Sequence, residues 1–184
     1  MSSQEDTRRE IEPGSAVGGS PIERAAATGD LHIVLFEPEI AANVGAIGRS
    51  CVAAGATLWL VRPYGFILSD RRLKRAGLDY LDDLRLREVD DLSEIDRLLG
   101  RDRLWLFSTK GERVYTDATY RRGDALVFGP ESRGLPRRLL DERPDRVVRI
   151  PIRPEARSLN LAVAASVGAF EAIRQITRDD RSIS

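Results

Sequence analysis

The sequence predicts an α/β fold in which a parallel sheet is flanked by helices on both faces. Three observations support this prediction. Short apolar runs such as Leu31–Phe36 and Thr57–Val61 alternate with longer segments of helical character, the order expected of β-α-β units. These runs are apolar along their whole length, which is typical of strands buried on both faces. The length of 184 residues fits a single domain with one core.

The elements follow in chain order. Strands are expected at residues 31–36, 57–61, 103–108, 125–128 and 147–150. Helices are expected at residues 43–54, 69–77, 136–140 and 158–176, and another helix runs through Leu99 from a cap at Asp91 or Ser93. Gly55 is expected to end the first helix, because glycine readily adopts the left-handed conformation found there.

The two ends of the chain differ from its middle. Residues 1–29 are rich in Ser, Gly, Glu and Arg and show no apolar periodicity, so they are predicted to form a disordered N-terminal tail. The folded domain is expected to span residues 30–178, and residues 179–184 a flexible C-terminal end.

Composition excludes several classes of protein. No apolar run approaches the roughly 20 residues that span a bilayer, so a membrane protein is not expected. Cys51 is the only cysteine and His32 the only histidine, which leaves neither an internal disulfide nor a zinc-type cluster. The first ten residues lack the apolar region of a secretory signal, and the protein is therefore expected in the cytoplasm, without a metal.

The basic residues are almost all arginines. Lys74 and Lys110 are the only lysines among 29 basic residues, and 29 acidic residues balance them. A general composition bias explains this choice, but arginine also suits bidentate contacts with phosphate. Zero net charge disfavours a non-specific nucleic-acid coat and still allows a local basic patch.

Two common nucleotide-binding motifs can be excluded. Gly129 and Gly134 have the glycine spacing of a phosphate loop, but Leu135 and Pro136 stand where Lys and Ser or Thr are required. The segment Gly45–Arg49 follows a strand without completing the G-x-G-x-x-G pattern, and no acidic residue ends the second strand. Neither a phosphate-loop NTPase nor an ordinary Rossmann site is predicted.

Ligands of parallel sheets bind at the carboxyl ends of the strands, where this chain places residues 108–111, 129–134 and 150–154. Three motifs with polar residues are candidates for a ligand site: Asn43-x-Gly45-x-x-x-Arg49, Gly129-Pro130-Glu131 and Ser158-Leu159-Asn160. Each also has a structural interpretation. Asn43 and Ser158 are possible N-caps, and Glu131 is a possible ion-pair partner of Arg133. Arg49 lies in an otherwise small, apolar helix, where an arginine is rarely buried without a partner.

These motifs together resemble a known family. The resemblance rests on seven segments: Phe36–Ile40, Asn43–Gly45 with Arg49, Leu73–Tyr80, Ser108–Gly111, Phe128–Pro136, Ile150–Pro154 and Arg157–Leu161. Over about residues 31–176 the chain is similar to the SPOUT RNA methyltransferases of the SpoU branch, most closely to the small members that act on the tRNA wobble nucleotide. Two departures are Ala162, where relatives commonly have a hydroxyl residue, and Phe170, where close relatives often have tyrosine.

The resemblance implies a C-terminal trefoil knot, a homodimer and S-adenosyl-L-methionine as the methyl donor. The cofactor contacts implied by motif position are Phe107, Ser108, Thr109, Gly129, Glu131, Ile150, Ile152, Ser158, Leu159 and Asn160. In the family, the arginine that matches Arg49 is assigned either to ribose deprotonation or to phosphate positioning. We favour positioning, because a guanidinium is a very weak base. Glu131 and Asn160 would orient Arg49, and Asn43 would fix its loop.

The implied activity is 2′-O-ribose methylation of a tRNA wobble cytidine or uridine. Candidate phosphate contacts are Arg72, Lys74, Arg75, Arg133 and Arg157, although residues 71–75 also fit a solvated helix face. The last helix is apolar around much of its circumference, which favours a dimer interface. The alternatives are methylation of rRNA or of another tRNA position, and a non-catalytic RNA-binding knot protein.

Overall fold

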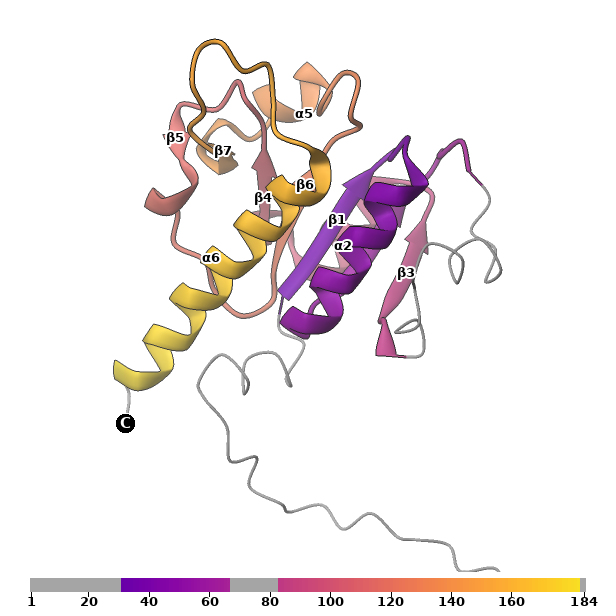
Figure 1. The fold of residues 1–184 in the computed structure, drawn as a ribbon. Helices are drawn as coiled ribbons and strands as arrows, with labels where there is room; N and C mark the ends of the chain where they lie inside the picture. The colour runs from indigo at the N-terminus through magenta and orange to yellow at the C-terminus, as the bar shows by residue number, and fades with distance from the viewer. Residues whose placement is uncertain (1–30, 67–82, 183–184) are drawn as a thin grey trace, which may run out of the picture.

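A computed structural model describes residues 31–66 and 83–182, with the side chains of 179–182 excepted (Figure 1). The predicted tail at 1–29 and the predicted basic helix at 69–77 lie outside the described residues, as do Arg72, Lys74 and Arg75.

The core of the fold is a parallel sheet. The described strands are β1 (Leu31–Phe36), β2 (Thr57–Val61), β3 (Leu86–Val89), β4 (Leu104–Phe107), β5 (Arg113–Val114), β6 (Asp124–Phe128) and β7 (Val147–Arg149). They form a seven-stranded sheet in the order β3-β2-β1-β6-β4-β7-β5, and every pairing is parallel. The predicted parallel sheet is confirmed. Its carboxyl edge gathers the ends of β1, β6, β4 and β7.

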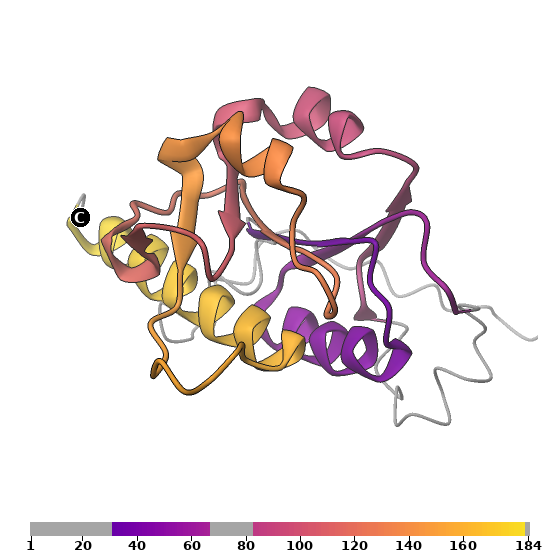
Figure 2. The ribbon, with the colours of Figure 1, turned by 90° about the horizontal axis from the view of Figure 1, so that it is seen from above.

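Helices cover both faces of this sheet (Figure 2). The helices are α2 (Ala41–Ala54), α4 (Leu92–Leu99), α5 (Arg137–Asp141) and α6 (Leu161–Ser182), with 3-10 turns η2 (Arg101–Arg103), η3 (Tyr115–Asp117) and η4 (Pro144–Arg146). The long helices α2 and α6 lie side by side on one face, and α4 and α5 cover the other. Among the described helices, none has both the length and the apolarity needed to cross a membrane.

Alternation along β1 explains the two apolar layers. Ile33 and Leu35 belong to the cluster that includes residues of α2 and α6, whereas Val34 belongs to the cluster on the opposite face. All three side chains are at most 1% exposed. Successive strand residues point to opposite faces, so a strand covered on both sides must be apolar throughout. Each such side chain contributes about 1.5–3 kcal/mol on burial.

Helix boundaries follow the capping groups. Asp91 caps α4 through a reciprocal capping box with Glu94, which confirms Asp91 rather than Ser93 as the cap. Gly55 ends α2 in the left-handed conformation, with φ of 63°, as predicted. In contrast, α2 begins at Ala41, two residues before the predicted start at Asn43, and its N-cap is Ile40. The interpretation of Asn43 as a plain N-cap is therefore wrong.

The last helix also differs from the prediction at its ends. It begins at Leu161 rather than at Ser158 and runs to Ser182 rather than to Ile176. The Oδ1 atom of Asn160 accepts hydrogen bonds from the N–H groups of Ala162 and Val163, so Asn160 performs the capping role considered for Ser158. The short strands β3 and β5 were not predicted from sequence. Exposed charged residues interrupt both strands, Arg87 and Glu88 in β3 and Arg113 in β5, so neither strand gives an apolar run.

Candidate functional site

A cavity of about 620 Å³ opens at the carboxyl ends of β4, β6 and β7, beside the start of α6. Most of the residues predicted to form the site line this cavity: Asn43, Phe107, Ser108, Thr109, Gly129, Glu131, Arg133, Ile150, Ile152, Arg157, Ser158, Leu159 and Asn160. Three loops that are distant in sequence therefore meet in one place. Its volume is typical of cavities that hold nucleotide-sized ligands.

Glu131 joins the β6 loop to the start of α2. Its carboxylate accepts hydrogen bonds from Glu39 N–H (2.9 Å), Ile40 N–H (3.3 Å) and Nδ2 of Asn43 (2.8 Å). Backbone donors at a helix start favour a negative charge. Glu131 therefore supplies, from a distant part of the chain, the cap that the local sequence of α2 lacks.

Arg133 does not pair with Glu131, so that interpretation is wrong. Its guanidinium forms ion pairs with Glu37 and Glu39 instead. Glu39 also accepts hydrogen bonds from the N–H (2.9 Å) and the hydroxyl (2.7 Å) of Ser132. The Ser132 hydroxyl, then its N–H, and also the charge of Arg133 lower the pKa of Glu39 from its usual value. Residues 131–133 are thus each bound to residues 37–43.

A second link connects α2 to α6. Nδ2 of Asn160 donates to Oδ1 of Asn43 at 3.0 Å. Asn43 is only 8% exposed and donates to Glu131, so its side chain bridges Asn160 and Glu131. The hydrogen bonds from Asn43 to Glu131 and from Asn160 to Asn43 connect all three of the motifs considered in the sequence. A buried amide with partners on both of its ends holds one orientation.

Glycines allow the β6 loop to fold tightly. A Cβ atom built on Gly129 would overlap the backbone of Gly134 and Leu135. Gly134 has φ of 68°, a left-handed conformation that favours glycine, and its N–H donates to Pro130 C=O at 2.9 Å. The loop therefore needs glycine at residue 129 for space and at residue 134 for backbone conformation.

The apolar wall of the cavity includes aromatic and aliphatic side chains. The rings of Phe107 and Phe128 lie 4.6 Å apart between centroids. Ile150, Ile152 and Leu159 line the wall and are half-buried. Among the described residues, the segment 151–159 has one hydrogen bond within itself, from Ala156 N–H to Arg153 C=O at 3.0 Å. An apolar slot bordered by backbone groups of this kind suits a flat heterocycle.

Arg49 lies apart from the cavity. It is exposed on α2 and is not among the residues that line the cavity of its own chain. Lys110 and Ser132, which also line the cavity, lie within the predicted ligand-binding segments, whereas four other lining residues lie outside them: Ile40, Leu135, Leu161 and Ala164. The only sequence signal for these four residues was their proximity to the predicted segments. Within the described chain, no group of three His, Cys, Asp or Glu residues gathers as a metal site would require.

Residues 30–170 match the family model described as the SpoU rRNA Methylase family. The chain belongs to the SpoU methylase family. A tRNA (cytidine(34)-2′-O)-methyltransferase of Saccharophagus degradans is 46% identical over 146 residues, which are 79% of this chain and 95% of that relative. The family assignment confirms the resemblance that the motifs indicated.

Solved structures of SpoU methylase relatives have the same fold. One of them, described as "Structural insights into the 2-OH methylation of C/U34 on tRNA", is 48% identical, with a TM-score of 0.73, and covers 79% of this chain and 95% of that one. An AdoMet-bound rRNA methyltransferase from Sinorhizobium meliloti is 26% identical, with a TM-score of 0.69, and covers 85% of this chain and 60% of that one.

Proposed function

We propose that this protein methylates the 2′-hydroxyl of the wobble nucleotide of tRNA, a cytidine or uridine, with S-adenosyl-L-methionine as the methyl donor. The observation that carries the proposal is the cavity at the carboxyl edge of the sheet, which is lined by the hydrogen-bonded residues Glu131, Asn43 and Asn160. Similarity to a tRNA (cytidine(34)-2′-O)-methyltransferase over 95% of its length supports the choice of substrate.

The cavity fits the cofactor in size and chemistry. Phe107, Ile150 and Leu159 would hold the adenine ring, and backbone groups near Ser108, Thr109, Gly129, Ile152 and Ser158 would hold its polar atoms and the ribose. The overlap that a Cβ on Gly129 would cause shows how closely the backbone approaches itself beside this cavity. When bound, the sulfonium supplies an activated methyl group, so no metal is required.

The protein's own residues act by placement. Glu131, fixed by two backbone donors and Asn43, holds one wall of the site in a single position. Asn160 holds the start of α6 against that wall. Placing two reacting groups in line lowers a barrier by several kcal/mol without any change in their chemistry. Arg49 would position the target phosphate and hydroxyl.

A homodimer explains how Arg49 reaches a site that its own chain does not place beside it. Arg49 shares an exposed stripe of α2 with Ala42, Ala46 and Ala53. The neighbouring helix α6 exposes Val163 (49%) and Phe170 (44%). Exposed apolar side chains on two adjacent helices favour burial against a second copy. In such a dimer, Arg49 of one protomer would face the cavity of its partner.

The proposal also covers the topology of the C-terminal part, the two ends of the chain and the location of the protein in the cell. We infer a trefoil knot in the C-terminal part of a methyltransferase domain of residues 30–178, with the loops at 108–111, 129–134 and 150–154 as its knot loops. Residues 1–29 and 179–184 would be flexible ends of a cytoplasmic protein. Arg133 and Arg157, at the rim of the cavity, would contact tRNA phosphates together with Arg72, Lys74 and Arg75.

Methyl transfer from labelled S-adenosyl-L-methionine to unmodified total tRNA tests the function. The expected result is label on the 2′-oxygen of nucleotide 34, found by mapping the modified nucleoside. Label at another tRNA position, or on rRNA alone, would replace the proposed substrate. Calorimetric titration with the cofactor separates the third possibility, because absence of binding would identify a non-catalytic RNA-binding protein.

A further inference from the structure

A second cleft lies apart from the cofactor cavity. It has a volume of about 490 Å³ and brings together β5, the turn η4 and the loop before β6. Its most distinctive lining is a group of arginines around one indole ring. Arg146 lies 4.6 Å and Arg113 5.9 Å from the centroid of Trp105. Arg121 lines the same cleft.

The base of the cleft is fixed by a buried carboxylate. Asp124 is 2% exposed and accepts hydrogen bonds from Nε1 of Trp105 (3.0 Å) and the N–H of Arg121 (2.9 Å). Its other oxygen pairs with Nε of Arg103 at 3.1 Å. Asp124 therefore neutralises Arg103 and holds the indole in one orientation. Buried charges are stable only when paired in this way.

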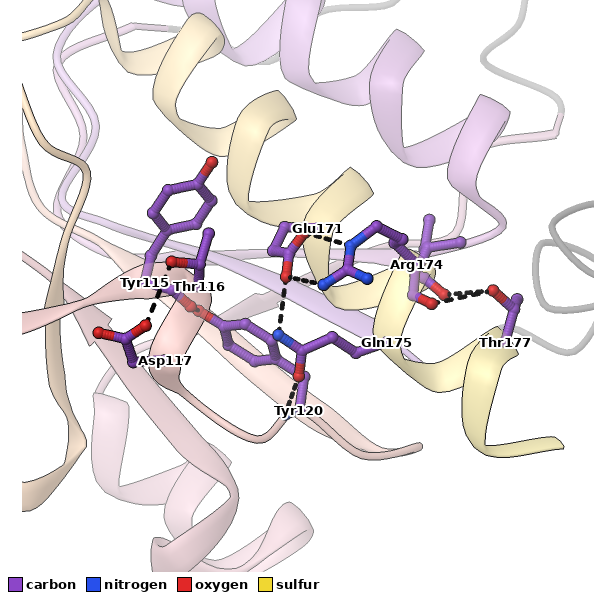
Figure 3. Close-up of polar contacts among 9 residues, drawn as sticks. Tyr115, Thr116, Asp117, Tyr120, Glu171, Arg174, Gln175 and Thr177 are labelled. Atoms are coloured by element: carbon purple, nitrogen blue, oxygen red, sulfur yellow. Dashed lines mark hydrogen bonds and ion pairs between the residues drawn. The ribbon is translucent and has the colours of Figure 1, made fainter. Parts of the chain in front are cut away.

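The wall that carries Arg121 is anchored to α6 (Figure 3). The N–H of Tyr120 donates to Oε1 of Gln175 at 3.0 Å, and the Tyr120 hydroxyl donates to Tyr115 C=O at 2.8 Å. Gln175 is held in turn by Glu171, at 2.8 Å. Tyr120 is fully buried and packs edge-on against Trp105, with centroids 5.5 Å apart. The wall that carries Arg121 is thus held by side chains of the fold itself.

Among the described residues, three guanidinium groups of this cleft form no ion pair with a carboxylate, although Arg146 interacts electrostatically with the nearby Asp124. These groups belong to Arg113, Arg121 and Arg146, and the Arg113 guanidinium donates to the backbone oxygen of Asp145 at 3.1 Å in addition to its contact with the Trp105 ring. The carboxylates of Asp102 and Asp145 also line the cleft, so its excess of positive charge is small. A small excess of positive charge, carried by several planar guanidinium groups, suits one or two phosphate groups rather than a long polyanion.

The cleft lies at the amino ends of β4, β6 and β7, and the cofactor cavity lies at the carboxyl ends of the same short strands. Trp105 and Phe107 are two residues apart on β4, so their side chains face the same side of the sheet about 7 Å apart along the strand. Phe107 lines the cofactor cavity and Trp105 the cleft. A tRNA is far longer than the four residues of β4, so one RNA can extend from the cavity to the cleft.

We propose that this cleft binds one or two backbone phosphates of the substrate RNA through Arg113, Arg121 and Arg146. The proposal rests on the function proposed above, because that function brings an RNA to the neighbouring cavity. It adds a contact surface that is separate from the rim of the cavity, and it assigns a role to the buried pair of Trp105 and Asp124 as positioning residues for the arginines.

The test compares tRNA binding by the full-length wild type, R121A and R113A/R146A between about 50 and 200 mM salt. The double variant is expected to bind more weakly. The slope of log K against log salt concentration should become shallower by about 0.7–0.9 per lost phosphate contact. The KM for tRNA should rise while kcat at saturating tRNA stays within about twofold. The matched control, R97A/R101A, removes two exposed arginines from α4 and η2 and should bind as the wild type does.

Each outcome decides the proposal. Equal affinity and equal salt dependence in the cleft variants and the control would overturn it. R121A keeps this test valid if the double variant unfolds, because the Arg121 guanidinium has no hydrogen bond in the described structure. Inorganic phosphate that binds the wild type but not R113A/R146A, with tRNA affinity unchanged, would assign the cleft to a free phosphate ligand instead. If the wild type fails to methylate tRNA, the proposed function fails, whereas the binding assay still reports on the cleft.

Discussion

Nδ2 of Asn160 donates a hydrogen bond to Oδ1 of Asn43, 3.0 Å away, although 117 residues separate them in sequence. The same Asn160 caps α6 through its Oδ1 atom. One side chain therefore begins a helix and connects that helix to another. These two roles use different atoms, so substitutions can separate them.

Replacing Asn160 should separate stability from activity. N160D keeps an oxygen that caps α6 but loses the donor to Asn43, so its melting temperature should stay within a few degrees while methyl transfer falls about tenfold or more. N160A loses both roles and should also be about 1 kcal/mol less stable. Thermal melts and steady-state kinetics on the three proteins check this. Equal activity of N160D and wild type would contradict a role for the Asn43 bond.

Replacing Glu131 should disturb the cavity wall. E131Q places an amide N–H₂ against donors from Glu39, Ile40 and Asn43, so at least one hydrogen bond is lost. A hydrogen bond to a charged group contributes about 1.5–3 kcal/mol. We expect weaker cofactor binding by calorimetry and a lower kcat/KM. E155Q, at an exposed carboxylate, is the control and should match the wild type.

Alanine substitution should distinguish the two glycines of the β6 loop. G129A is expected to abolish cofactor binding, because its methyl group would overlap the backbone of Gly134 and Leu135. G134A meets open space, but its positive φ should cost about 1–2 kcal/mol. G65A, where a Cβ meets no atom within 4 Å, is the control. Wild-type cofactor affinity in G129A would refute the tight-loop argument.

Charge on the exposed apolar stripe of α6 should break the proposed dimer. V163E/F170E replaces two side chains that are 49% and 44% exposed, so the substitutions are not expected to unfold the monomer. Light scattering should show a dimer for the wild type at micromolar concentration and a monomer for the variant, with methyl transfer lost. A wild-type monomer would remove the dimer and the role of Arg49 across it.

The cap of α4 should make stability depend on acid pH. Bonds from the N–H and then the hydroxyl of Ser93 lower the pKa of Asp91 from its usual value. Its contribution is therefore fully present above about pH 4, the ordinary Asp pKa, and is lost as pH falls through the lower folded value. Denaturant unfolding of wild type and D91S should show a stability difference at pH 6 that diminishes towards pH 2. A difference that is independent of pH would contradict this assignment.

The sequence predicted the elements whose ends are set locally. The strand Leu31–Phe36 and the end of α2 at Gly55 match the structure, because an apolar run and a glycine carry those signals in themselves. The start of α2 was misplaced by two residues, since its capping carboxylate comes from Glu131. A cap from so far along the chain leaves no local pattern.

The three site motifs were predicted individually, and their meeting point was indicated by the rule that parallel strands bind ligands at their carboxyl ends. The pairing of Arg133 with Glu37 and Glu39 was not predictable, because it depends on β1 and β6 being neighbours in the sheet. The arginine cleft was not predicted either, because it depends on β6, β4, β7 and β5 lying side by side in the sheet. Its residues come from η4, β5 and the loop before β6, and none forms a recognisable motif.

The pairing of β1 with β6 has a consequence for synthesis on the ribosome. Leu31 lies opposite Asp124, so β1 cannot pair with β6 until most of the chain has left the ribosome. Until then, one edge of a strongly apolar strand is open to pairing with other nascent chains. Slow translation or truncation before residue 124 should therefore lead to aggregation rather than to a smaller folded protein.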